Sequence, residues 1–123
     1  MTDTSLEYAQ SRIHKIPDYP VPGVIFQDIM PVLADGAAFT TAVRELIRPF
    51  AGQFDIVAGV EARGFLLAGA AAIDCGVGML PIRKAGTLPR PAVDVAYTLE
   101  YGVAKIEAQD DIPSGSRVLI IDD

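Results

Sequence analysis

Three short, nearly continuous apolar runs are the feature that most constrains the fold of this 123-residue chain. They occupy residues 54–60, 77–84 and 116–122, and a segment of small residues with the length of a helix, 61–74, follows the first run. Strands that are apolar throughout are typical of parallel sheets, which are covered on both faces. We therefore predict a single α/β domain over 1–123, with a largely parallel twisted sheet flanked by helices.

The rest of the chain supplies covering helices and a flap. Apolar positions at helical spacing predict helices over 4–15 and 36–50, while residues 24–29 form an extended segment or a short strand. The prolines and the glycine of 17–23 predict a turn-rich connector. Residues 93–109 alternate loosely between apolar and polar, which predicts a hairpin flap.

The composition excludes several classes of function. Sixteen acidic residues against ten basic ones give a formal net charge of -6, which argues against a nucleic-acid surface because phosphate contacts need clustered Lys and Arg. The N-terminus lacks the features of a signal peptide, and the longest apolar stretch, 64–73, is too short to span a bilayer. Cys75, the single cysteine, fits a reducing compartment. We expect a cytoplasmic protein that binds neither nucleic acid nor membrane.

Glycines and cations gather where the predicted strands end. Ligands of open α/β sheets bind beyond the carboxyl ends of the strands. After the first run, Gly59 and Gly64 allow close backbone approach, Arg63 supplies a cationic fork, and the following helix offers free N–H groups. Arg83 and Lys84 end the second run. Together these groups would suit a phosphate or pyrophosphate, whereas each motif alone also fits an ordinary surface turn.

Acidic and aromatic residues complete the candidate site. Asp122 and Asp123 end the third run, where carboxylates could accept from hydroxyl groups or hold Mg²⁺ through water. Neighbouring side chains on a strand point to opposite faces, so both acids can line one pocket only if the strand is already turning into a loop. Phe26 could stack on a planar base or pack in the core. Glu100 and Tyr101 would lie near the tip of the flap, over a ligand or in a surface salt bridge.

Five segments of the chain occur in an informative order. They are IPDYPVPGVIFQDIMPVL, VAGVEARGFLLAG, LPIRKAGTLP, YTLEYG and RVLIIDD. In this order they resemble the adenine phosphoribosyltransferase family, a branch of the type I phosphoribosyltransferases, from about residue 12 to the last residue. The resemblance implies a homodimeric enzyme of purine salvage that joins adenine to phosphoribosyl pyrophosphate, giving AMP and pyrophosphate, with Mg²⁺.

The resemblance also implies a role for each candidate residue. The main chain of Ile25 and Gln27 would read the edge of adenine while Phe26 stacks on its ring. Glu100 and Tyr101 would belong to a flexible catalytic loop. No residue is expected to bind the metal directly. The residues that the resemblance assigns to phosphoribosyl pyrophosphate are Ala62, Arg63, Gly64, Arg83, Lys84, Asp122 and Asp123.

Four details of the family pattern bear on this chain. The resemblance implies a non-proline cis peptide between Glu61 and Ala62, and an arginine at position 83 that reaches across a dimer interface. Gln27 stands where many relatives have Arg, a change that backbone reading of adenine survives. Thr87 stands where a Lys is frequent, which puts one pyrophosphate contact in doubt.

Other interpretations stay open at this point. The chain could be a phosphoribosyltransferase for another purine such as xanthine, a non-catalytic purine-responsive regulatory module, or a poorly folded, inactive piece. In the family, the strand with two acids leads into a loop that holds the ribose 5-phosphate. We therefore expect the chain to be C-terminally incomplete, ending before that loop, and to be inactive by itself.

Overall fold

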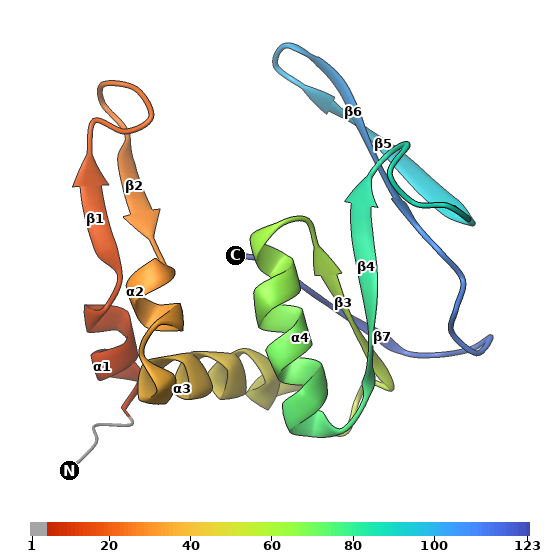
Figure 1. Cartoon of the computed structure of the whole chain (residues 1–123), viewed down its shortest axis with the longest axis horizontal. Coiled ribbons are helices and arrows are strands. Elements are labelled where there is room, and N and C mark those ends of the chain that lie inside the picture. The colour runs from red at the N-terminus through yellow and green to blue at the C-terminus, as the bar shows by residue number, and fades with distance from the viewer. Residues whose placement is uncertain (1–4) are drawn as a thin grey trace. The chain divides into compact units, whose positions relative to one another are not determined.

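The computed structural model describes residues 5–123, which form two compact units, one up to Pro49 and one from Phe50 onward (Figure 1). The single-domain organisation expected from the sequence stays a prediction, and each unit is described by itself. The helices are α1 (Leu6–Ser11), α2 (Met30–Leu33), α3 (Gly36–Ile47) and α4 (Arg63–Cys75), with a 3₁₀ turn at Arg48–Phe50. The strands are β1 (His14–Pro17), β2 (Ile25–Asp28), β3 (Ile56–Val60), β4 (Gly78–Lys84), β5 (Val93–Leu99), β6 (Gly102–Ala108) and β7 (Val118–Ile121).

The first unit contains a β-hairpin. Strands β1 and β2 pair antiparallel, with Ile16 opposite Phe26, and this confirms the predicted extended segment over 24–29. The loop between the strands is closed by the N–H of Gly23, which donates to Asp18 Oδ1 at 2.9 Å. The proline-rich segment predicted to be a connector is therefore the loop of this hairpin.

The predicted helix over 4–15 is wrong in its second half. Helix α1 ends at Ser11, and the residues from His14 onward form strand β1; residue 4 lies outside the described residues. Pairing with β2 satisfies the backbone of this segment, and the proline that ends β1 cannot continue a helix because it has no N–H group. Long-range pairing thus outweighs the helical spacing of the apolar residues.

Helix α3 confirms the helix predicted over 36–50, whose last residues form the 3₁₀ turn. It begins after Asp35, whose carboxylate Oδ1 accepts from the N–H groups of Ala37 and Ala38, each at 3.1 Å. This cap satisfies two of the N–H groups that a helix start leaves without partners. The short helix α2 was not predicted, since a single turn leaves no periodic signal. The unit closes around a small buried cluster, Ala9, Val32 and Ala38.

The second unit is a mixed five-stranded sheet in the order β5-β6-β4-β3-β7. Strand β3 lies between β4 and β7 and pairs with both in parallel. Strand β6 pairs antiparallel with β4 and with β5, which forms the hairpin flap seen in Figure 1. The α/β class and the flap are thus confirmed, while the parallel part is confined to β4, β3 and β7.

Helix α4 packs closely on the parallel strands. Ala68 and Ala71 on this helix are fully buried. A Cβ atom on Gly59 of β3 would lie 2.6 Å from the carbonyl oxygen of Gly64 and 2.7 Å from Cβ of Ala68, so only glycine permits this approach. The helix ends at Cys75, because the next residue, Gly76, has a left-handed φ of 69°. Among residues 5–123, no helix has the length and apolar character needed to cross a bilayer.

Candidate functional site

The connection between β3 and α4 forms the centre of the candidate site. Strand β3 ends at Val60 and α4 begins at Arg63, so Glu61 and Ala62 make the whole connection. The peptide bond between these two residues is cis, which confirms the prediction from the family resemblance. Ala62 gives the helix no side-chain cap. The first turn of α4 therefore offers backbone donors to an anionic ligand.

Glu61 ties this turn to the end of β4. Its N–H donates to the carbonyl oxygen of Ile82 at 2.9 Å, which continues the parallel pairing. Its carboxylate Oε1 accepts from the N–H of Lys84 at 3.1 Å and from Nε of Arg83 at 3.2 Å. The Lys84 N–H, and then the Arg83 guanidinium, hold the pKa of Glu61 below its ordinary value. Sequence reasoning missed this contact, because the partners lie more than twenty residues away.

Strand β7 ends beside the first residues of α4. It stops at Ile121, so Asp122 and Asp123 lie beyond the strand and meet the condition for lining one pocket. Asp123 Oδ2 lies 2.8 Å from Nε of Arg63. A Cβ atom on Gly64 would lie 2.8 Å from the carbonyl oxygen of Ile121 and 3.1 Å from Asp122 Oδ1. Both acids are therefore next to the turn that follows β3.

The predicted site residues fall in three places. Those assigned to phosphoribosyl pyrophosphate gather at the carboxyl ends of β3, β4 and β7. Glu100 and Tyr101 form the turn of the β5–β6 hairpin, and Tyr101 is 94% exposed. Ile25, Phe26 and Gln27 belong to β2 of the first unit, where Phe26 contacts Tyr19 edge-on with ring centroids 5.2 Å apart. The roles of all these residues stay predictions.

A buried carboxylate lies behind the loop that follows β4. Glu107 of β6 is 6% exposed, and among residues 5–123 it is the one charged side chain in the buried class. It accepts from the N–H groups of Gly86 and Leu88, both at 2.8 Å. These donors hold the pKa of Glu107 below its ordinary value. Sequence reasoning missed Glu107 too, although an acid placed between Ile106 and Ala108 was a signal for a buried charge.

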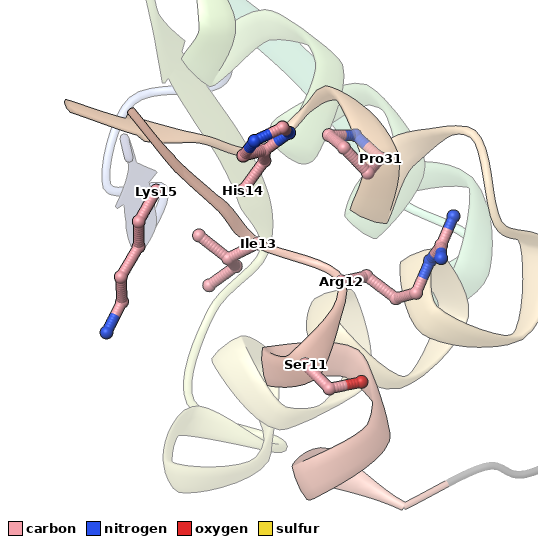
Figure 2. A pocket seen from close by; sticks show the side chains of 6 residues that line it. All are labelled: Ser11, Arg12, Ile13, His14, Lys15 and Pro31. Atoms are coloured by element: carbon pink, nitrogen blue, oxygen red, sulfur yellow. The ribbon is translucent and has the colours of Figure 1, made fainter. Parts of the chain in front are cut away.

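A pocket in the first unit does not form a comparable site. Its lining residues are Ser11, Arg12, Ile13, His14, Lys15 and Pro31 (Figure 2). Figure 2 shows that the side chains of Arg12 and Lys15 point in different directions. Arg12 Nε also lies 3.7 Å from the carboxylate of Asp35. These cations do not converge on one point where an anion could bind.

The mixed sheet with its helices and hairpin flap is the fold of the type I phosphoribosyltransferases. The solved adenine phosphoribosyltransferase of Thermoanaerobacter pseudethanolicus matches with a TM-score of 0.87 and 42% identity, over 97% of this chain and 70% of its own. The enzyme of Saccharomyces cerevisiae, crystallised with D-2,5-dideoxy-2,5-imino-altritol 1,6-bisphosphate and adenine, matches with a TM-score of 0.84 and 36% identity, over 95% of this chain and 72% of its own.

Sequence comparison leads to the same group. The adenine phosphoribosyltransferase of Renibacterium salmoninarum is 58% identical over 118 residues, which are 95% of this chain. No protein-family profile matches the chain. On the strength of these relatives, the chain belongs to the adenine phosphoribosyltransferase family. It spans 65% of the length of the Renibacterium relative.

Proposed function

We propose that the protein containing this chain transfers the phosphoribosyl group of phosphoribosyl pyrophosphate to adenine, giving AMP and pyrophosphate in purine salvage. The observation that supports this most is the meeting of three strand ends at one sheet edge. There Arg63 Nε lies 2.8 Å from Asp123 Oδ2 after β7, and Arg83 and Lys84 end β4 on the other side of β3. Cations beside carboxylates suit a ligand that carries both phosphates and sugar hydroxyls. The names of the relatives support adenine as the base.

The turn after β3 and the basic pair of β4 suit the departure of pyrophosphate. When the bond from ribose C1 to pyrophosphate breaks, its electron pair leaves with the pyrophosphate and positive charge develops on the sugar. Arg63, Arg83, Lys84 and the N–H groups at the start of α4 would stabilise the leaving charge. Glu61 accepts from Arg83 through Nε at 3.2 Å, and this contact would orient the guanidinium toward the leaving group. Removing one such donor costs roughly 3–4 kcal/mol in the transition state.

Asp122 and Asp123, which follow β7, suit the ribose of the substrate and the Mg²⁺ that accompanies it. Asp122 and Asp123 would accept hydrogen bonds from the ribose hydroxyls. Proteins hold Mg²⁺ through one or two carboxylates, water and substrate phosphates, and these residues fit that pattern. Among residues 5–123, no group of three or more His, Cys, Asp or Glu is placed to hold a metal ion. We assign Mg²⁺ to the bound substrate, where it would neutralise part of the pyrophosphate charge.

We assign the binding of adenine to β2 and the removal of its proton to the flap. Phe26 would stack on adenine, with the main chain of Ile25 and Gln27 reading its edge. As N9 of adenine attacks ribose C1, the purine gives up a proton, and Glu100 would accept it in the closed site. The exposure of Tyr101 at the flap tip supports a segment that folds over a ligand rather than one packed in the core.

A cytoplasmic homodimer is the assembly that we propose. The single cysteine of the chain supports a reducing compartment. The family resemblance supports a dimer in which Arg83 reaches the partner's site. The side chain of Arg83 is 37% exposed in the single chain, so it has room to do so.

Formation of AMP tests the proposal. The chain is assayed beside a chimera in which the part of the Renibacterium relative that follows its aligned region is joined after Asp123. With adenine, phosphoribosyl pyrophosphate and Mg²⁺, the chimera should form AMP, and the chain alone should not. The double variant Arg83→Ala/Lys84→Ala should lose at least about 100-fold in rate. The control is Arg90→Ala, which removes an exposed arginine of the loop that follows β4; this arginine pairs with Asp111 at 2.9 Å.

A mixture of bases separates the alternatives. Adenine, hypoxanthine, guanine and xanthine are supplied in equal amounts in one reaction. AMP as the main product supports the proposal, while IMP, GMP or XMP as the main product shows a transferase for another purine. A chimera that binds adenine but forms no nucleotide would favour the regulatory module.

A further inference from the structure

The proposed function leaves the buried carboxylate of Glu107 without a role. A carboxylate in a buried position is unfavourable unless hydrogen bonds compensate for the lost water. The partners of this side chain therefore indicate what it does.

Both carboxylate oxygens bind the turn that follows Lys84. Gly86 N–H donates to Oε1 and Leu88 N–H donates to Oε2, each at 2.8 Å. Gly86 has a φ of 87°, and this left-handed residue allows nearby N–H groups to converge on one anion. The hydroxyl of Thr87 donates to the carbonyl oxygen of Lys84 at 2.5 Å, which closes the turn directly behind the basic pair.

Strand β6 thus connects two parts of the candidate site. Glu107 lies opposite Arg83 in the β4–β6 pairing, and the N–H of Ala85 donates to the carbonyl oxygen of Lys105 at 2.9 Å. At its other end, β6 begins at Gly102, directly after the flap tip. One strand therefore carries the flap and the anchor of the basic pair.

We propose that Glu107 is a positioning residue that holds the 84–88 turn, and with it Arg83 and Lys84, in the conformation that binds pyrophosphate. This inference rests on the proposed function. The two N–H donors favour the ionised carboxylate, so the anchor persists at neutral pH. A glutamine at this position could accept through one oxygen only, and its NH₂ group would face a second N–H donor.

The test uses three variants. Glu107→Gln removes one acceptor, and Glu107→Asp keeps the charge but shortens the reach. Asp94→Asn is the matched control, because Asp94 lies opposite Glu107 in the β5–β6 pairing but is exposed and pairs with Lys105 at 3.4 Å. Steady-state kinetics of the chimera give kcat and the KM of each substrate. Hydrogen exchange of the Gly86 and Leu88 amides is measured on the 123-residue chain.

We expect Glu107→Gln to raise the KM for phosphoribosyl pyrophosphate about 10- to 100-fold, because small misplacements of binding groups have effects of this size. The KM for adenine should stay unchanged, and the Gly86 and Leu88 amides should exchange faster. Glu107→Asp should give an intermediate result. Asp94→Asn should match the wild type in all of these quantities.

An unchanged KM for phosphoribosyl pyrophosphate in Glu107→Gln would overturn the inference. A lower kcat beside that unchanged KM would show only a smaller folded fraction. If Glu107→Gln fails to fold, Glu107→Asp decides by the same criteria. A wild-type chimera that neither forms AMP nor binds phosphoribosyl pyrophosphate refutes the proposed function and the positioning role with it, even if the amide exchange shows that the anchor exists.

Discussion

Replacing Gly64 by alanine tests the close approach of α4 to β7, which places Arg63 beside Asp123. A Cβ atom at position 64 would lie 2.8 Å from the carbonyl oxygen of Ile121 and 3.1 Å from Asp122 Oδ1. The nearer atom belongs to the backbone at the end of a strand, so it cannot rotate away. Either the helix or the strand end must shift to admit the methyl group.

Gly69 provides a matched control on the same helix. A Cβ atom there would meet nothing within 4 Å. Alanine in a helix interior is favoured over glycine by about 0.5–1 kcal/mol, so Gly69→Ala should raise the free energy of unfolding by that amount. Gly64→Ala adds a methyl group to a filled space, which typically costs about 1–3 kcal/mol. The free energy of unfolding of Gly64→Ala should therefore lie about 1.5–4 kcal/mol below that of Gly69→Ala.

The assay is urea denaturation followed by far-ultraviolet circular dichroism, since the chain has no tryptophan for fluorescence. The wild type and the two variants are compared at the same pH and protein concentration. Equal stabilisation by Gly64→Ala and Gly69→Ala would refute the reasoning, because it would mean that α4 does not approach β7 closely at residue 64.

Three further predictions concern charge and ligand binding. Asp55 accepts three hydrogen bonds from Arg117, at 2.8, 2.9 and 3.2 Å, and they lower its pKa from 3.8 to about 2. Because the folded pKa is the lower one, this stabilisation is complete above pH 3.8 and is lost as the pH falls towards 2. Asp55→Asn should therefore lower the urea midpoint at pH 7. Between pH 4 and 2, the midpoint of the variant should fall less steeply than that of the wild type. Parallel curves of midpoint against pH for the two proteins would contradict the account. Glu61→Gln should weaken the binding of phosphoribosyl pyrophosphate to the chimera in calorimetry and leave adenine binding unchanged, since it loosens the contact to Arg83; equal losses for both ligands would point to general unfolding. Phe26→Ala should weaken adenine binding about 10- to 100-fold, in line with stacking worth roughly 1–3 kcal/mol, and equal weakening of both ligands would make Phe26 a core residue.

Much of the second unit could be predicted from the sequence, because its signals are local. The apolar runs became β3, β4 and β7, and the small-residue segment became α4. The rule that ligands gather at the carboxyl ends of parallel strands then placed Arg63, Arg83 and Asp123 at one edge of the sheet. In the structure, Arg63 lies beside Asp123, and Arg83 lies at the same end of the adjacent strand β4.

What could not be predicted depends on partners that are distant in sequence. Strand β1 was read as the end of a helix, because its pairing with β2 leaves no mark on the local apolar pattern. The contacts of Glu61 with Arg83 and of Glu107 with Gly86 join residues 22 and 21 positions apart. An acidic residue in or after a strand looks the same in sequence whether it faces solvent or a backbone N–H group.

The measurement that tests the central claim most directly is a titration of the isotopically labelled chain with phosphoribosyl pyrophosphate and Mg²⁺, followed by the NMR shifts of its backbone amides. If the ends of β3, β4 and β7 form the binding site, the largest shifts should occur at residues 61–64, 84–88 and 122–123. The amide shifts of residues 11–15, which line the pocket of the first unit, should not change. Shifts confined to residues 11–15, or no shift at any of the three strand ends, would contradict the account.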